Sequence, residues 1–232
     1  MGSELQYITL YEQCREMICA NSSDVMNRHR EEAFDYLREH GFPTRKSERY
    51  KYTDLQRLFE PDYGLNLRRL DIPVNPYDAF RCDVPNLSTS LYFVVNDAFY
   101  THALPKGKLP SGVIVDSLRS VSASRPQLVT PYYATLARSD GDSVTALNTM
   151  LAQDGLLVYV PRGVKIDRTI QVINILRSDV DLMVNRRVLI IVEEGAEARL
   201  LFCDLIIFKN FLNFFNRSKS EQIKTEFHKS FA

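Results

Sequence analysis

The stretch DGLLVYVPRGVKIDRTIQVINILRSDVDLMVNRRVLIIVEEGAEARLLFCD, residues 154–204, decides the fold of this 232-residue chain. It contains three short runs rich in β-branched residues, at 156–160, 170–175 and 188–192, and such runs are typical of strands. The segments between the runs are too short to hold crossover helices. The strands can therefore pair only as antiparallel hairpins or stack as the coils of a β-solenoid.

Two of these runs end in a turn that contains glycine: PRGV (161–164) follows the first, and EEGA (193–196) follows the third. After the second turn, Ala198, Leu200 and Phe202 recur at every second position, as on one face of a strand. In a solenoid each coil buries its apolar face only against the next, so one or two coils alone are marginally stable. The last coil would also leave an unpaired strand edge, which favours aggregation or non-native dimers.

The residues that precede this stretch carry helix signals. Ser22-Ser23 can cap a helix, apolar residues then recur at helical spacing, and Gly41 followed by Pro43 ends the pattern. We therefore expect one helix over Asp24–His40. The segment Leu5–Cys19 is mixed in character and is compatible with another helix.

The middle of the chain predicts an alternation of short helices and strands. Thr53 is a suitable N-cap for a short helix through Leu55–Phe59. Residues 62–127 are rich in proline and contain strand-like runs such as LYFVV (91–95). Residues 130–153 return to helical spacing in two segments, which an Asp-Gly-Asp sequence separates.

Composition limits the classes of function. The chain carries 29 Lys+Arg and 29 Asp+Glu, so no overall field would attract nucleic acid or an acidic membrane. Hydrophobic residues make up 45% and charged residues 25%, as in ordinary globular proteins. The N-terminus shows no apolar leader, and no window approaches the length of a transmembrane helix. We therefore expect a cytoplasmic protein with neither a membrane nor a nucleic-acid partner.

No catalytic or metal-binding set stands out, so we assign no catalytic or metal residue and leave cofactor-binding residues unknown. The cysteine spacings match no zinc or cluster motif, which favours reduced thiols: Cys14, Cys19, Cys82 and Cys203. The histidines lie in charged or loop segments, typical of surface positions: His29, His40, His102 and His228. Glu193-Glu194 resembles a pair of catalytic acids, but its place at a tight turn favours solvent exposure over acid–base work.

Two basic segments are candidate binding sites. The turn PKGK (105–108) lacks the spacing of a phosphate-binding loop, so we expect no ATP hydrolysis by this chain alone. The segment RKSERYKY (45–52) mixes basic and aromatic residues, a combination that some nucleic-acid and anion sites use. Because Glu48 and Asp54 dilute its charge, we favour a structural or partner-docking role.

Two segments carry a family resemblance. GFPTRKSERYKYTDL (41–55) resembles the signature Gly-apolar-Pro-Thr-Arg-Lys-x-Glu-x-Trp/Tyr-Lys-Tyr-Thr-x-Leu near the start of SufD-type members of the SufB/SufD family. ALNTMLAQDGLLVYVPRGV (146–164) resembles the beginning of that family's β-helix, as do IQV (170–172) and VEEGA (192–196). The two main matches occur in the family's order.

The resemblance implies an α+β fold, with an N-terminal helical region followed by a right-handed parallel β-helix that is truncated here to its first coils. It also implies a non-catalytic scaffold in the SUF system for iron–sulfur cluster assembly. Such a subunit pairs with a SufB-like subunit through the β-helix and supports a SufC-like ABC ATPase. The cluster is then assembled by the complex, and ATP is bound by the ATPase, so this chain alone holds no cofactor.

We therefore expect three parts: a helical and mixed region (1–153), the start of the β-helix (154–204), and a tail (205–232). The tail is rich in phenylalanine, lacks Gly and Pro, and departs from the family, which suggests a frameshift or a truncated gene model after Asp204. The resemblance is to longer proteins, so we expect the family's ATPase-docking region to be missing here. Two alternatives stay open: a carbohydrate-binding or carbohydrate-processing β-helix domain, and a nonfunctional truncated fragment.

Overall fold

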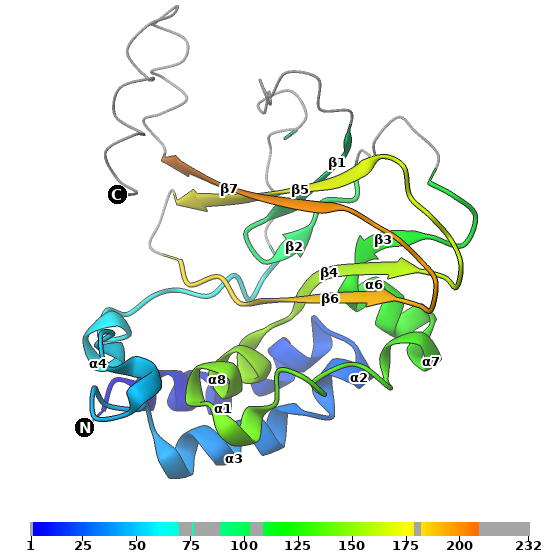
Figure 1. Ribbon diagram of the computed structural model, residues 1–232. Coiled ribbons are helices and arrows are strands. Elements are labelled where there is room, and N and C mark those ends of the chain that lie inside the picture. The colour runs from blue at the N-terminus through cyan, green and yellow to red at the C-terminus, as the bar shows by residue number, and fades with distance from the viewer. Residues whose placement is uncertain (1, 70–75, 77–88, 103–108, 179–181, 209–232) are drawn as a thin grey trace, which may run out of the picture.

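The computed structural model describes residues 2–69, 76, 89–102, 109–178 and 182–208, and it shows a mixed α/β fold with helices first and strands after them (Figure 1). The helices are α1 (Glu4–Ala20), α2 (Asp24–Asn27), α3 (Arg30–His40), η1 (Glu48–Tyr50), α4 (Leu55–Leu58), α6 (Leu118–Ser124), α7 (Pro126–Val129), η2 (Ser139–Gly141) and α8 (Ser143–Leu151). The strands are β1 (Thr89–Val95), β2 (Ala98–Phe99), β3 (Ile114–Ser117), β4 (Asp154–Val160), β5 (Thr169–Ser178), β6 (Arg186–Val192) and β7 (Leu200–Phe208).

The expected single helix over Asp24–His40 is wrong, because the chain forms α2 and α3 with a break between them. Ser23 caps α2 as expected, accepting a hydrogen bond from the amide of Met26. After the break, the buried side chain of Arg30 donates to backbone carbonyls at the C-terminus of α8. At the break, the amide of His29 donates to the carbonyl of Met26, only three residues earlier, at 3.4 Å, and the regular four-residue spacing is found again from Ala33 to His29. The expected helix over Leu5–Cys19 is confirmed as α1.

Two further helix predictions need correction. The N-cap of α4 is Asp54 rather than Thr53, and its carboxylate accepts from the amide of Arg57 at 3.1 Å. The segment from Thr130 onward forms turns instead of a helix, and Ala134 adopts a left-handed φ of 59° that a right-handed helix does not allow. The second expected segment is confirmed as α8, which Asp142 caps.

The strands form two sheets whose order is β2-β1-β5-β7 and β3-β4-β6. Strands β4 and β6 pair in parallel, as do β5 and β7. The chain therefore crosses to the other sheet after each strand, and each new strand pairs with the strand two positions earlier in the sequence. This arrangement excludes hairpins among the strands of residues 154–208, one of the two alternatives that the sequence left open. Apolar residues from both sheets fill the space between them, including Leu156, Val158, Ile170 and Val172.

A repeat of 32 residues underlies the stacking of β4 on β6. Val160 pairs with Val192, and Lys165 forms an isolated bridge with Glu197. The turns between these positions also stack, because the amide of Gly163 donates to the carbonyl of Glu194 at 3.0 Å. Gly163 and Gly195 occupy equivalent places with φ of 71° and 70°, a conformation that glycine adopts without steric cost.

The outer face of the β3-β4-β6 sheet packs on helices. Leu157 of β4 and Ile191 of β6 join a buried cluster with residues of α2, α6 and α7, and these helices lie beneath the sheet in Figure 1. A separate core joins α1, α3 and α8. Strand β7 continues through Phe208, past the boundary expected at Asp204, and residues 209–232 lie outside the described residues. Within the described ranges, no helix combines the length and apolar character of a membrane span.

Candidate functional site

The strands β6 and β7 are the last strands of their sheets, and within the described residues each is paired along one side only. Strand β7 follows β6 through one turn, so both free edges lie at the same end of the stack (Figure 1). Free strand edges present unpaired N–H and C=O groups, which can pair with another chain. This end of the stack is the leading candidate for a functional surface.

An apolar row runs along β6 at this end. Val188, Ile190 and Val192 are 46%, 42% and 43% exposed, whereas the residues that they pair with on β4 are fully buried. Paired residues of adjacent strands share one face, so the row faces the space between the sheets. On β7, Phe202 is 41% exposed beside the buried Val172. One more strand on either sheet would remove this apolar surface from water.

The backbone of β6 has a defined orientation along its free edge. The amide of Glu193 donates to the carbonyl of Val160 on β4 at 3.0 Å. Backbone groups point alternately to the two sides of a strand, so the odd-numbered residues of β6 bond to β4. The N–H and C=O groups of the apolar row, at positions 188, 190 and 192, therefore point away from β4 toward the free edge.

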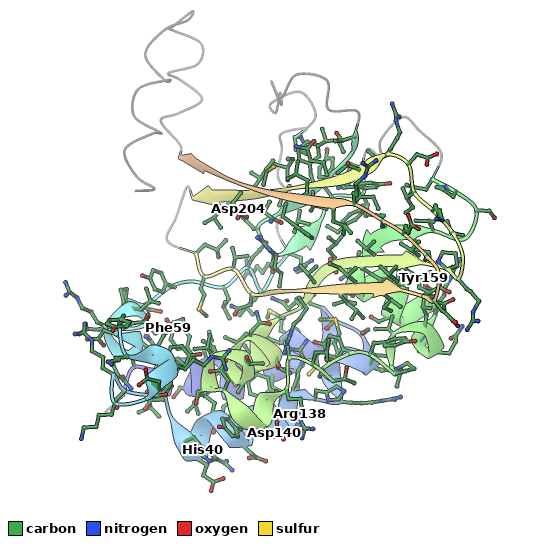
Figure 2. The ribbon with its side chains drawn as sticks, in the orientation of Figure 1. His40, Phe59, Arg138, Asp140, Tyr159 and Asp204 are labelled. Atoms are coloured by element: carbon green, nitrogen blue, oxygen red, sulfur yellow. The ribbon has the colours of Figure 1, made fainter. Side chains whose placement is uncertain are left out.

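Charged residues close both ends of β6. At its start, Arg186 donates to the carbonyl of Asn96 at 2.9 Å. At its end, Glu193 accepts from the hydroxyl of Tyr159 at 2.9 Å, where β4 leads into its turn (Figure 2), and Glu194 pairs with Arg162 at 2.8 Å. The side chains of Glu194 and Arg162 are both highly exposed. Glu193 and Glu194 therefore lie in the turn that follows β6, as predicted from the sequence.

A polar pocket of about 220 Å³ forms a second candidate beside β2, β3 and the start of β4. Arg69 joins two carboxylates there, reaching Asp97 at 2.8 Å and Asp154 at 3.3 Å. Asp154 also accepts from the hydroxyl of Ser117 at 2.8 Å and from the amide of Arg119 at 3.0 Å. The charges of this cluster are largely satisfied by one another, as expected of groups that hold elements together.

Asp97 is the exception in this cluster. Burial raises the pKa of its carboxyl above the ordinary value of 3.8, and the charge of Arg69 opposes that shift. One of its oxygens is buried and has no hydrogen-bond partner within the described part of the chain. Sequence reasoning missed this group because Arg69, Asp97 and Asp154 lie far apart in the sequence without a shared motif. The sequence did contain one signal for this cluster, because Asp97 directly follows the strand β1 and Asp154 is the first residue of β4.

The basic and aromatic segment 45–52 is tied to neighbouring acids. The hydroxyl of Tyr50 donates to Asp142, the N-cap of α8, and Arg49 lies 3.7 Å from the same carboxylate. Arg45 lies 3.5 Å from Asp54. The sequence suggested a structural or partner-docking role, and the contacts with Asp142 join the segment to the beginning of α8.

The histidines occupy separate places. His29 lies against Tyr133, His40 stacks on Tyr36 at the end of α3 (Figure 2), and His102 lines the polar pocket. Cys14, Cys19 and Cys203 are free thiols. Cys82, His228 and the turn at 105–108 lie outside the described residues. Within the described ranges, no three His, Cys, Asp or Glu side chains gather as metal ligands would.

Comparisons with known proteins give one consistent result. The model of the family described as SufBD protein N-terminal region matches residues 1–172. An iron–sulfur cluster assembly SufBD family protein of Synechocystis is 23% identical over 183 residues, which cover 78% of this chain and 39% of that protein. The chain therefore spans well under half of the length of this relative.

Proposed function

The chain belongs to the SufBD family, and on that premise we propose that it is a non-catalytic scaffold subunit of an iron–sulfur cluster assembly complex. In this proposal it pairs with a SufB-like subunit and supports a SufC-like ABC ATPase. The segment 41–55 favours a SufD-type member. The cluster is the product of the whole complex and ATP is the ligand of the ATPase, so neither is held by this chain alone.

The observation that carries the proposal is the exposed apolar row on the free edge of β6. A strand that offers both backbone hydrogen bonds and apolar side chains is suited to strand addition by another protein. The charged groups of the polar pocket, in contrast, are engaged mainly with one another. This contrast supports a role in assembly over a role in catalysis.

The alternation of strands between two sheets supports a β-helix. In the proposed arrangement, β4 to β7 form the first coils of a right-handed parallel β-helix that continues in longer relatives. The 32-residue repeat and the stacked glycine turns are what successive coils would produce. The right-handed sense follows the general preference of parallel crossover connections. No specific observation favours a carbohydrate-processing domain or a nonfunctional fragment.

Co-purification tests the proposed function. A tagged chain is co-expressed with the SufB-like subunit and the ABC-type ATPase of its own organism, and we expect the SufB-like subunit to be retained. We expect the ATPase to be retained together with the SufB-like subunit.

A matched pair of variants sharpens this test. Ile190→Lys places a charge on the free edge of β6, whereas Leu136→Lys makes the same kind of change at a residue that is 98% exposed and off the sheets. We expect Ile190→Lys to lose the SufB-like subunit and Leu136→Lys to keep it. Equal retention by both variants, or no retention by the unmodified chain, would contradict the proposed function.

A further inference from the structure

We propose that the surface of residues 45–58, which contains η1 and α4, binds an acidic segment of a partner protein. The inference goes beyond the proposed function and does not depend on it. It starts from the sequence of this surface, RKSERYKYTDLQRL, which contains five Lys or Arg and only two Asp or Glu. The whole chain carries equal numbers of basic and acidic residues, so positive charge is concentrated in this segment.

The fold uses only part of this positive charge. Arg45 lies 3.5 Å from the carboxylate of Asp54, and Arg49 lies 3.7 Å from that of Asp142. The other three cations are exposed and have no carboxylate within ion-pair distance in the described part of the chain: Lys46, Lys51 and Arg57. The exposed Glu48 offsets one of these charges. The segment therefore keeps a positive surface, which complements an acidic partner.

Apolar side chains lie among the free cations. Tyr52 is 90% exposed and Leu58 is 52% exposed. The ammonium of Lys51 lies 5.7 Å from the centre of the Tyr52 ring, so this surface presents a charge and an aromatic face together. Tyrosine and arginine are enriched among the residues that dominate the binding energy of protein interfaces. Tyr52 can therefore act as the apolar anchor of the docked segment.

The fold also holds this surface in a defined conformation. The hydroxyl of Tyr50 donates to the N-cap carboxylate of α8, and the side chain of Leu55 is buried. Between them, the amide of Thr53 donates to the carbonyl of Tyr50 at 2.9 Å. Lys51 and Tyr52 thus lie in a turn that is fixed on both sides. A surface that is ordered before binding loses less conformational entropy when a partner docks.

The arrangement favours a polypeptide over a nucleic acid. Proteins bind single-stranded nucleic acid by stacking successive bases on several aromatic side chains along a positive groove. Here Tyr50 is engaged with α8, which leaves Tyr52 as the exposed aromatic residue of the segment, and Glu48 would repel phosphates. Figure 1 places α4 beside the N-terminus and away from β6 and β7, so this surface is separate from the free strand edges.

Peptide binding to residues 1–232 tests the inference. The probe is a labelled peptide of about five Glu-Glu-Phe repeats, and the control peptide has Lys in place of every Glu. Fluorescence anisotropy measures both dissociation constants. We expect the acidic peptide to bind and the basic peptide not to bind, and we expect added salt to weaken the binding, because exposed charges are screened. No binding of the acidic peptide, or equal binding of both peptides, would overturn the inference.

A single-stranded RNA of the same net charge serves as a competitor in this assay. We expect it to displace the acidic peptide poorly, because only one aromatic side chain is available for stacking. Tighter binding of the RNA than of the acidic peptide would overturn the inference and assign the surface to nucleic acid.

Matched variants test whether binding occurs at this surface. Arg57→Glu reverses a free cation, and Arg125→Glu makes the same change at an exposed residue outside the segment. We expect Arg57→Glu to raise the dissociation constant of the acidic peptide about tenfold, since an attraction becomes a repulsion, and Arg125→Glu to leave it nearly unchanged. Tyr52→Ala should raise it about fivefold, with Tyr132→Ala as its control. Circular dichroism confirms that all four variants fold, and equal effects within either pair would overturn the inference.

Discussion

Arg30 shows how one residue can join two parts of this fold. Its guanidinium donates to the carbonyls of Thr149, Met150 and Ala152 at 3.2, 2.7 and 2.6 Å, where α8 ends and β4 approaches. The last carbonyls of a helix lack partners within the helix, and a cation is favoured there. Arg30 therefore fixes the helical region to the beginning of the first stacked strand.

Replacement of Arg30 should be costly. Arg30→Met leaves three buried carbonyls without their donor, and we expect the free energy of unfolding to fall by about 2–4 kcal/mol. Arg15→Met is the matched control, because Arg15 makes an exposed ion pair with Glu31 and should cost less than about 1 kcal/mol. Urea denaturation measures both values. Equal losses in the two variants would contradict this role of Arg30.

Asp97 should give the chain a distinctive dependence on pH. Burial raises the pKa of its carboxyl above 3.8, although Arg69 opposes the shift, so the folded state holds its proton more tightly than the unfolded chain does. Stability contributed by this group is therefore full at low pH and is lost as pH rises from 3.8 through the raised value. Denaturation of wild type and Asp97→Asn across this range should show the wild type losing stability relative to the variant.

Asp140 supplies a control with the opposite sign. A hydrogen bond from Arg138 lowers the pKa of the exposed Asp140 carboxyl (Figure 2), so its small contribution is present above 3.8 and disappears as pH falls. Relative to Asp140→Asn, the wild type should gain stability as pH rises. If Asp97→Asn gave a slope of this same sign, Arg69 rather than burial would dominate at Asp97.

Residue types and spacing predicted some of these positions. Ser23 as a cap and Glu193-Glu194 at a turn both follow from local chemistry, and the structure agrees with each placement. The cluster of Arg69, Asp97 and Asp154 could not be predicted. Arg69 lies outside the strands, Asp97 lies between β1 and β2, and Asp154 begins β4, so only the packing of these parts brings them together.

At the scale of elements, the turns that contain Gly163 and Gly195 are the parts of the stack that depend most on one residue type. Gly163 has a left-handed φ of 71°, and a Cβ placed there would meet nothing within 4 Å. Gly163→Ala should therefore lower the free energy of unfolding by about 1 kcal/mol through backbone strain alone. Thermal denaturation measures the change.

Gly141 is the matched control for Gly163. A Cβ there would also meet open space, but the backbone does not have a left-handed φ. Gly141→Ala should be neutral or slightly stabilising, because alanine restricts the unfolded chain. A similar loss in both variants would show that the turn conformation is not what requires glycine at position 163.

Strands were easier to predict than the helices around them. Apolar runs located β4, β5 and β6, because each strand places apolar residues on a face that packs in the fold, although β6 leaves Val188, Ile190 and Val192 partly exposed. The break between α2 and α3 could not be predicted, because no glycine or proline marks it in residues 24–40. Parallel stacking was one of two predicted outcomes. The repeat of VPRGVKI (160–166) as VEEGAEA (192–198) is a signal in the sequence that could have decided between them.

At the scale of the whole molecule, helices cover one face of a two-sheet stack, and among the described residues no strand pairs with the outer edges of β6 and β7. The helices cover the outer face of the β3-β4-β6 sheet, and the two sheets bury a common core. The free edges of β6 and β7 are then the places where the described fold can be extended. We therefore expect assembly with another protein to take place along these edges.

Photo-cross-linking from position 190 probes the edge of β6 in the assembled complex. A photo-activatable residue replaces Ile190 in the chain co-expressed with its SufB-like subunit, and the same residue at Leu136 serves as the control. We expect a covalent adduct between position 190 and a strand of the SufB-like subunit, and no adduct from position 136. Co-purification of the two proteins without an adduct at 190, or with equal adducts at both positions, would contradict it.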